Sequence, residues 1–512
     1  MDSAAPSFRA HMAADASGKH LQAEDAPAAG AHEHGPDPRR WRALAVLSIA
    51  YLMVVLDVAI VNVALPSIQK DLHFHGETSL QWVVSGYALT FGGLLLLGGR
   101  AGDLLGRRRP FMIGLALFSL FSLLCGLSVS AGMLIAFRLA QGAAGAVLSP
   151  SVFSITSVTF EEGSERNKAL GILGAIAGSG AAIGVLLGGV LTQYAGWEWI
   201  FFVNVPIGFG TLLLVPRVVR ESRAHGLLQH FDASGAVTVT ASLTLLVFGL
   251  TQSTSHGWSS GQVIGSLVGS AALMAAFLAI ESRSRSPLVP LGFFRKRTPT
   301  GANVIGFGLG TSIFGMFFLL SLYMQQVLGF SALKTGVGYL AIALLAVVAS
   351  GVSQALVTRL HVRPVLSVGL LMLIGGLVYL TRISTNGSYF GDLFVPFCLI
   401  GVGLGFSFVP ISIAALGGIT PSEAGLASGL INTTQQVGGA LGLAILATVS
   451  SSRTSHLLDI GTPRPSALTQ GFTLAFWVAA GVAAIALFST WFVLRGEELT
   501  AAEAEAVTAP AS

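Results

Sequence analysis

Long runs of apolar residues alternate with short polar segments along almost the whole chain. Each run has about 17 to 27 residues, enough to cross about 30 Å of hydrocarbon as an α-helix. The first seven runs lie near residues 43–66, 82–99, 111–129, 131–157, 169–193, 200–216 and 235–252. The other seven lie near residues 262–280, 302–324, 336–357, 365–381, 393–414, 425–448 and 471–494. The pattern therefore predicts an all-α membrane protein with 14 transmembrane helices.

The composition agrees with a chain that is mostly embedded in a bilayer. Hydrophobic residues make up 53% of the 512 residues, charged residues only 10%, and the mean hydropathy is +0.75. Such values nearly exclude a water-soluble protein. The net charge of +4 is small, and we attribute it to membrane topology, so we expect no nucleic-acid partner.

Basic residues collect in every second loop, which predicts the orientation of the chain. If the N-terminus is cytoplasmic, the inner segments hold Arg39, Arg40, Arg42, Arg107, Arg108, Arg109, Arg217, Arg220, Arg223, Arg283, Arg285, Arg295, Lys296 and Arg297. The outer loops keep only Lys70, Lys334, Arg382, Arg453 and Arg464. Because cytoplasmic loops are enriched in Lys and Arg, we expect a multi-pass protein of the cytoplasmic membrane with both termini inside.

The chain also shows signs of an internal repeat. The segment GGRAGDLLGRRRP at 98–110 has a faint echo in TRLHVRP at 358–364, and parallel repeats of six helices are one way to build a transporter around a central site. The expected units are a disordered cytoplasmic tail at 1–40, a six-helix bundle at 41–220, an inserted two-helix hairpin at 221–297, a second six-helix bundle at 298–495 and a cytoplasmic tail at 496–512.

Two ionisable side chains lie deep inside apolar runs, and a charge in hydrocarbon is costly enough that such residues usually serve function. At 1.5 Å per residue, Asp57 lies roughly 14 Å from one end of its run and Arg138 roughly 10 Å from the matching end of its own, so both share one depth. Desolvation favours a neutral Asp57, whereas Arg138 favours the carboxylate, so we interpret Asp57 as a proton carrier. The alternative is a permanent ion pair that only fixes helix packing, although buried pairs stabilise little for their cost.

Four motifs follow one another in the first half of the chain. They are LDVAIVNVALP at 56–66, with Asp57, Asn62 and Pro66; Gly99, Asp103, Gly106, Arg107 and Arg108 after the second run; Arg138, Gln141, Gly142 and Gly145 in the fourth; and Gly171, Gly180, Gly184, Gly188 and Gly189 in the fifth. Over nearly all of residues 41–495 the chain resembles the major facilitator superfamily, and within it the fourteen-helix drug:proton antiporters. The resemblance implies proton-coupled export of amphipathic drugs or antibiotics by alternating access, with protons and a small amphipathic molecule as partners.

The resemblance also implies roles for two of the motifs. Gly99, Asp103, Gly106, Arg107 and Arg108 would form a cytoplasmic gate, in which Asp103 is attracted to the helix N-terminus that the capping pattern Thr420–Glu423 predicts. Gly180, Gly184 and Gly188 share one helix face and, with Gly171 and Gly189, would form a hinge or gate. The chain departs from the family pattern at Val185, where a proline is usual, and at Glu198, where a basic residue is usual.

Aromatic and uncharged amide side chains are the candidates for substrate contact, since they suit amphipathic molecules. They are Tyr51, Tyr87, Gln141, Phe317, Tyr323, Gln325, Asn432 and Gln435. No Walker-type phosphate loop, zinc-ligand spacing or nucleophile elbow occurs. We therefore expect no enzymatic activity, catalytic residue, metal, cofactor or use of ATP.

Two other functions remain open from the sequence. One is export of an endogenous lipid or metabolite by the same mechanism. The other is a non-transporting sensor or scaffold, whose mark would be the loss of Asp57 or Asp103, and both are present. Arg outnumbers Lys by 23 to 5, which suggests a GC-rich bacterial genome such as that of an actinobacterium.

Overall fold

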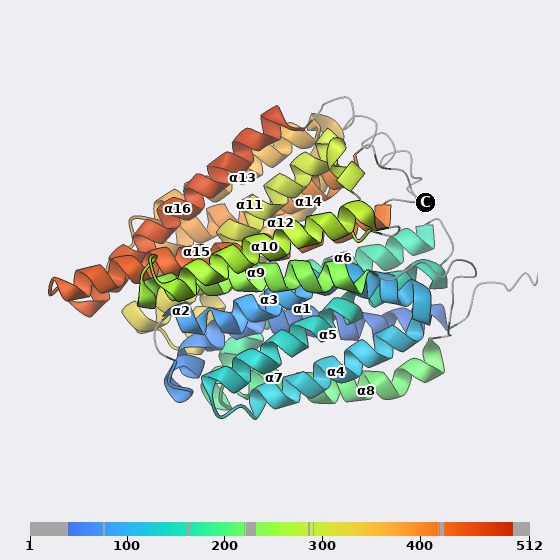
Figure 1. Ribbon diagram of the computed structural model, residues 1–512, viewed down its shortest axis with the longest axis horizontal. Helices are drawn as coiled ribbons and strands as arrows, with labels where there is room; N and C mark the ends of the chain where they lie inside the picture. The colour runs from blue at the N-terminus through green and yellow to red at the C-terminus, as the bar shows by residue number, and fades with distance from the viewer. Residues whose placement is uncertain are drawn as a thin grey trace, which may run out of the picture. The chain divides into compact units, whose positions relative to one another are not determined.

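The computed structural model describes residues 39–74, 77–160, 164–219, 221, 232–284, 287–289, 291–417, 419 and 424–494, and within them all regular structure is helical (Figure 1). The long helices are α1 (Arg40–Asp71), α3 (Trp82–Leu105), α4 (Arg108–Gly126), α5 (Ala131–Thr159), α6 (Ser164–Tyr194), α8 (Asn204–Val218), α9 (Ala233–His256), α10 (Gly261–Arg283), α11 (Arg297–Leu322), α12 (Ala332–Leu360), α13 (Val362–Leu380), α14 (Phe394–Leu416), α15 (Ala424–Asp459) and α16 (Arg464–Phe492). Short segments complete the order: α2 (Glu77–Leu80), α7 (Trp199–Phe202), the 3-10 turn η1 (Leu291–Arg295) and the π-helical turns η2 (Tyr323–Val327) and η3 (Tyr389–Leu393). The expected tails at 1–40 and 496–512 lie outside the described residues, except for Arg39 and Arg40.

The prediction of an all-α membrane protein is confirmed, while the number of spans is only partly supported. In the described part of the chain, 11 helical segments are long and apolar enough to cross a membrane. The three long helices outside this set are α3, α6 and α15; shorter apolar stretches occur in α3 at Trp82–Leu95 and in α6 at Ile183–Tyr194. α15 is less apolar because its first half contains a run of polar residues, NTTQQ at 432–436.

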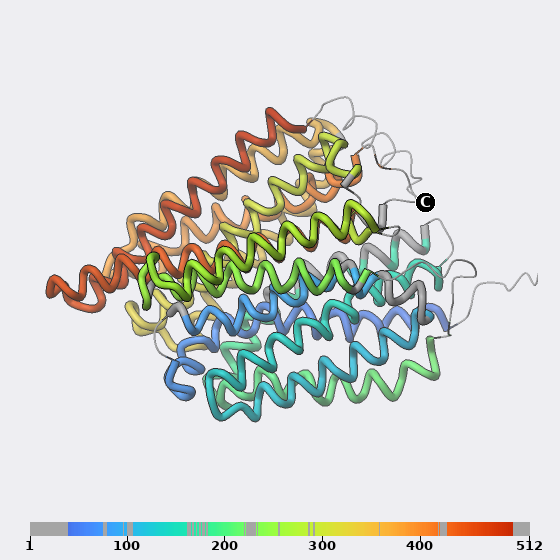
Figure 2. Tube along the Cα trace, in the orientation of Figure 1, coloured from blue at the N-terminus to red at the C-terminus, as the bar shows by residue number. Residues whose placement is uncertain are grey.

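Two helix boundaries differ from the apolar runs for local reasons. The run at 200–216 is divided at Val203 between α7 and α8, where Pro206 has no N–H to offer the carbonyl of Phe202. α15 extends well beyond the run at 425–448. After residue 448, the first glycine or proline is Gly461, which has a φ of +84° and follows the end of the helix. The turn between α15 and α16 consequently projects past the neighbouring helices (Figure 2).

Two groups of helices and a hairpin make up the described structure. In the N-terminal bundle (α1, α3–α6 and α8), α3 packs on α5, α1 on α6, and α4 on α5 and α8. In the C-terminal bundle (α11–α16), α11 packs on α15 and α16, α13 on α14 and α16, and α12 on α14. The bundles meet where α6 packs on α12 and α3 on α15. The hairpin of α9 and α10 lies along this second seam, since α9 contacts both α3 and α15 (Figure 1).

Reciprocal hydrogen bonds join the two helices of the hairpin. Ser242 Oγ donates to the carbonyl of Ser270 and Ser270 Oγ donates to the carbonyl of Ser242, both over 2.8 Å. Each serine thus satisfies a polar group inside an apolar interface, where no water is available to do so. The hairpin therefore behaves as one packed unit against the seam.

Candidate functional site

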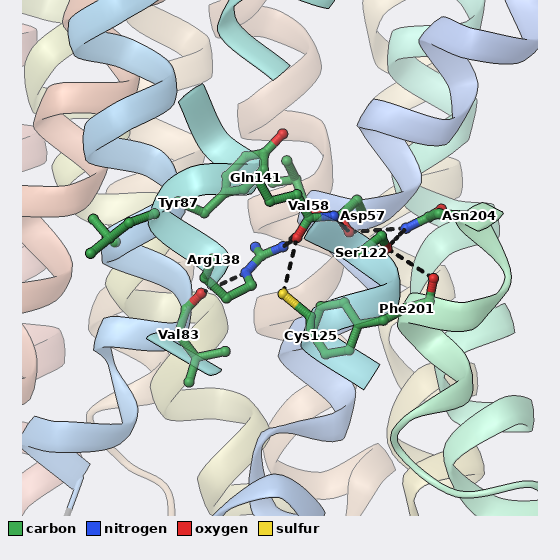
Figure 3. Close-up of polar contacts among 12 residues, drawn as sticks. Asp57, Val58, Val83, Tyr87, Ser122, Cys125, Arg138, Gln141, Phe201 and Asn204 are labelled. Atoms are coloured by element: carbon green, nitrogen blue, oxygen red, sulfur yellow. Dashed lines mark hydrogen bonds and ion pairs between the residues drawn. The ribbon is translucent and has the colours of Figure 1, made fainter. Parts of the chain in front are cut away.

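The buried acid and base form a pair inside the N-terminal bundle (Figure 3). Arg138 Nη1 on α5 donates to Asp57 Oδ2 on α1 over 2.6 Å. Arg138 Nε donates to the carbonyl of Val83 over 3.0 Å, and the guanidinium carbon lies 4.3 Å from the centre of the Tyr87 ring, a cation–π contact. Asp57 is 0% exposed and Arg138 1%. Three helices, α1, α3 and α5, therefore fix the charges away from solvent.

Both oxygens of Asp57 accept hydrogen bonds. Asp57 Oδ1 accepts from Gln141 Nε2 over 2.9 Å and from Asn204 Nδ2 over 3.1 Å. Gln141 Oε1 in turn accepts from Arg138 Nη1 over 2.8 Å and from Cys125 Sγ over 3.6 Å. Because an ionised carboxylate is a pure acceptor, three donors around Asp57 fit its charged form.

A second pair of polar residues completes the cluster. Asn204, near the start of α8, donates through Nδ2 to Ser122 Oγ on α4 over 3.0 Å, as well as to Asp57. Ser122 Oγ donates to the carbonyl of Phe201 over 2.9 Å. Asn204 is 1% exposed and Ser122 0%. Sequence reasoning missed both: Asn204 is a detectable amide in the apolar segment FFVNVPIG, whereas a serine in an apolar helix gives no signal.

The structure places Tyr87, a candidate for substrate contact, beside the ion pair of Asp57 and Arg138. Its ring stacks on the Phe91 ring at 5.6 Å and lies against the Arg138 guanidinium. Its hydroxyl oxygen is buried and has no hydrogen-bond partner among the described residues. A buried hydroxyl without a partner is unusual.

Glycines allow the helices around the cluster to approach closely. A Cβ on Gly142 of α5 would overlap the carbonyl oxygen of Tyr87 on α3. On α6, a Cβ on Gly184 would lie 2.8 Å from the Ala59 Cβ and 3.2 Å from the Leu56 carbonyl oxygen, one residue before Asp57. These glycines therefore allow α3 to pack closely on α5, and α6 to pack closely on α1.

The remaining glycines of α6 serve both interfaces of this helix. Cβ atoms on Gly180 and Gly188 would also collide with α1, at Val55 and Ile60. A Cβ on Gly189 would instead lie 2.9 Å from the Ala332 carbonyl oxygen of α12. One face of α6 thus packs on α1 and the other on the C-terminal bundle. The packing around Gly171 lies outside the part of the chain that the structure describes.

The basic motif after α3 is held by residues of its own bundle. Gly106 ends α3 with a φ of +85°, a conformation that favours glycine. The N–H of Arg108 donates to Glu221 Oε1 over 3.1 Å, and Arg108 Nη1 donates to the carbonyl of Val219 over 3.3 Å. A Cβ on Gly99 would lie 3.7 Å from the Cβ of Pro150 on α5. Nothing in the sequence pattern indicated Glu221 as a partner.

The gate expected at Asp103 lies outside the described residues. The side chain of Asp103 and the segment Thr420–Glu423, which were expected to meet, are not among them. Arg40 at the start of α1 donates to Glu165 at the start of α6 over 2.8 Å, and this hydrogen bond lowers the pKa of Glu165. The starts of α1 and α6 are thereby tied together.

Hydrogen bonds also join the two bundles toward the end of α1. Pro66 lies inside α1 and has no N–H, so the carbonyl of Asn62 lacks its usual helical donor. Ser321 Oγ of α11 donates to this carbonyl over 2.5 Å, and Gln325 Nε2 of η2 donates to the carbonyl of Val63 over 2.9 Å. The proline of the first motif thus exposes backbone acceptors that the other bundle uses.

The other expected cavity residues do not converge on one site. Tyr51 packs edge-on against Phe153, Phe317 packs against Tyr339, and the buried Tyr323 donates its hydroxyl proton to the carbonyl of Ser384. Asn432 is exposed and bonds its own helix, and Gln435 packs beside Gly310. Gln325 lines a cavity of about 370 Å³ at the last turns of α1 and α6, with Pro66, Ser67, Lys70, Thr192, Gln193, Phe330, Ser331 and Ala332.

Two bundles of apolar helices, with a buried, hydrogen-bonded ion pair inside the first, are typical of a multi-pass membrane transporter. A family model described as Major Facilitator Superfamily matches residues 47–443, and the chain belongs to this superfamily. The sequence-based recognition of the family is therefore confirmed.

Relatives support this membership over most of the chain. The puromycin resistance protein of Streptomyces alboniger is 38% identical over 478 residues, covering 91% of this chain and 94% of that protein. The cephamycin export protein of Amycolatopsis lactamdurans is 41% identical over 417 residues, covering 81% and 85%. A bacterial homologue of the human lysosomal transporter Spinster, solved inward-facing and occupied, has the same fold, with a TM-score of 0.62, 16% identity, and coverage of 91% of this chain and 99% of that one.

Proposed function

We propose that the protein exports amphipathic drugs or antibiotics across the cytoplasmic membrane in exchange for protons. The relatives named for puromycin resistance and cephamycin export support this direction and class of substrate. The observation that carries the proposal is the ion pair of Asp57 and Arg138, which is buried inside apolar helices and hydrogen-bonded to Gln141, Asn204 and the carbonyl of Val83.

The geometry of the pair suits a proton carrier better than a structural bridge. Replacing a buried ion pair with apolar residues is often neutral or stabilising, so a pair alone is a poor reason to keep two charges in a membrane. Protonation of Asp57 would neutralise the carboxylate and leave Arg138 without its counter-ion. Binding of a proton or release of a proton therefore changes the energy of the whole cluster.

The pH gradient supplies a defined driving force for such an exchange. One proton moving down one pH unit releases about 1.4 kcal/mol, which supports roughly a tenfold substrate gradient if one proton is exchanged per substrate. A membrane potential adds about 2.3 kcal/mol per charge per 100 mV. Coupling through Asp57 is what would convert these energies into export.

We place both ends of the chain in the cytoplasm, with fourteen spans: six in residues 41–220, two in 221–297 and six in 298–495. Basic residues at the start of α1 and at the α3–α4 connection support this orientation. The hydrogen bonds of Ser321 and Gln325 to α1 then lie on the outer side. Rocking of the two bundles would break them when the cavity opens outward.

The test is efflux from cells followed by transport in liposomes. Expression of the chain should raise the growth-inhibiting concentration of several compounds in a panel that includes puromycin and a cephamycin. In liposomes, a pH gradient should drive accumulation of such a compound with the membrane potential clamped.

Asp57→Asn mimics the protonated acid permanently, so gradient-driven transport should be lost while substrate binding is kept. Asp459→Asn, at the exposed end of α15, is the matched control and should transport normally. Full gradient-driven transport by Asp57→Asn would place the proton site elsewhere. Accumulation that never depends on pH would refute the exchange itself.

A further inference from the structure

Protonation of Asp57 creates a hydrogen-bonding conflict that only part of the cluster can relieve. Oδ1 of the carboxylate accepts from two amide nitrogens, and Oδ2 accepts from the guanidinium. Once either oxygen carries a proton, its O–H points at groups that are themselves donors. All these residues are almost fully buried, so water cannot supply the missing acceptor.

Arg138 cannot relieve the conflict. A guanidinium has five N–H donors and no acceptor. It is also fixed in place, because Nε donates to the carbonyl of Val83 and the ring of Tyr87 lies 4.3 Å from the guanidinium carbon.

Gln141 is locked in the same way. Its Oε1 already accepts from Arg138 Nη1 over 2.8 Å and from Cys125 Sγ. Turning its amide by half a rotation would bring the NH₂ group against the guanidinium, which is donor against donor.

Asn204 has the one amide that can turn without a clash of donors. Its Nδ2 donates to Asp57 Oδ1 and to Ser122 Oγ. A serine hydroxyl either donates or accepts. After a half rotation, the Asn204 carbonyl oxygen would accept from protonated Asp57 and from Ser122.

We propose that Asn204 and Ser122 are positioning residues that respond to the protonation state of Asp57. With the carboxylate charged, the Asn204 amide donates to it and Ser122 donates to the carbonyl of Phe201. With Asp57 protonated, the amide is reversed and Ser122 turns its proton toward Asn204. The hydrogen bond between α4 and Phe201 of α7 is then released, so a proton on α1 changes the contact at the α7–α8 break.

This inference rests on the proposed role of Asp57 and names the other groups that face it. The ionisable groups that interact with Asp57 are Arg138 on α5, Tyr87 on α3 and Cys125 on α4. The α7–α8 segment contributes the neutral Asn204 to the carboxylate. The Asn204 amide therefore responds to Asp57 by reversing its orientation, and it does not itself gain or lose a proton.

The first experiment is the pH profile of transport in liposomes for two variants. Asn204→Leu removes a hydrogen bond to Asp57 in both states, but the bond to the charged carboxylate is the stronger of the two, so the midpoint should move to higher pH. Ser122→Ala keeps the Asn204 donor but removes two hydrogen bonds of the charged state, from Asn204 Nδ2 to Ser122 Oγ and from Ser122 Oγ to the carbonyl of Phe201, and only one of the reversed state. Its midpoint should therefore also move to higher pH. Shifts of half a unit or more are expected for both variants, on the order of threefold in proton affinity.

The matched control is Ser119→Ala, one turn earlier on α4. Ser119 also faces α8, at Gly208, but its hydroxyl donates only to the carbonyl of Leu115 in its own helix. This variant should keep the midpoint of the unchanged protein. Loss of rate at every pH without a shift of midpoint in Asn204→Leu and Ser122→Ala would mean a merely structural role and would overturn the proposal.

The second experiment needs no transport. Infrared difference spectra on acidification should contain a carboxylic acid band, absent in Asp57→Asn, together with a change in an asparagine side-chain amide band, absent in Asn204→Leu. An Asp57 band without any amide change overturns the reversal. Both bands, in a protein whose transport does not depend on pH, would uphold the reversal while refuting proton-coupled export.

Discussion

At the residue scale, the ion pair is stabilised only as a complete set. Removing one partner of a buried pair leaves an unpaired charge, which costs about 3 to 5 kcal/mol. Neutralising both partners removes the charges together. The stability of single and double variants therefore reports how strongly Asp57 and Arg138 depend on each other.

We expect Arg138→Ala to lower the melting temperature of the detergent-solubilised protein clearly. Asp57→Asn combined with Arg138→Gln should melt closer to the unchanged protein, because no charge is left unpaired. The measurement is thermal unfolding followed by tryptophan fluorescence. A double variant that is as unstable as Arg138→Ala would mean that the cluster depends on the arginine's packing rather than on charge balance.

The glycines of α6 give a second prediction at this scale. Gly184→Ala would put a Cβ 2.8 Å from that of Ala59 and should destabilise the protein by about 1 to 3 kcal/mol. Gly265→Ala on α10 is the matched control, because no atom lies within 4 Å of the added Cβ. It should be neutral or stabilising by up to about 1 kcal/mol, since alanine favours a helix over glycine. Equal unfolding midpoints for both variants would remove the packing argument.

At the scale of elements, prolines inside helices create sites for neighbouring helices. Pro150 frees the carbonyl of Ala146, and Gly98 of α3 packs directly on it. Pro410 frees the carbonyl of Phe406, and a Cβ on Gly369 of α13 would lie 2.7 Å from that oxygen. In α1, Pro66 exposes an acceptor to a different bundle. The same local defect thus serves packing within a bundle and contact between bundles.

The contact at Pro66 should bias the conformation of the transporter. Gln325→Ala or Ser321→Ala removes one hydrogen bond between the bundles, worth about 1 kcal/mol, so the outward-open population should rise roughly fivefold. Gln470→Ala, exposed on α16, is the control. Spin labels at Tyr194 and Phe390, which are 77% and 76% exposed, report the distance between bundles in a variant without native cysteines. Unchanged distance distributions would show that these bonds do not hold the outer side closed.

The long helices and the pair of Asp57 and Arg138 were predicted from the sequence, whereas the turns and several residues around the pair were not. Apolar length alone located helices such as α4 and α10, and depth along the runs brought Asp57 and Arg138 to one level. Apolar length did not predict the π-helical turns, and it also missed the break at Val203, although Pro206 is visible in the sequence. Asn204, Ser122 and Glu221 were missed because their roles come from neighbours far away in sequence, and their own residue types are ordinary.

At the scale of the whole molecule, the fourteen-span topology makes a prediction about the α9–α10 hairpin. On that topology, Ser259 lies outside the cell and Ser282 inside, and both are exposed. Cysteines at the two positions should differ in labelling by a membrane-impermeant reagent added to intact cells, with Ser259→Cys labelled and Ser282→Cys protected. After permeabilisation both should react. Equal labelling in intact cells would exclude an inserted membrane-spanning hairpin.

The polar residues NTTQQ at 432–436 of α15 affect how the chain enters the membrane during its synthesis. On the proposed topology this helix crosses the bilayer, yet its amides and hydroxyls make it the least apolar of the long helices in the described C-terminal bundle. A translocation channel releases a segment into lipid according to its apolar character. We expect α15 to leave the channel together with α16, and to become stable only once α11 and α3 cover its polar side. The last stage of synthesis is then also the step that joins the two bundles.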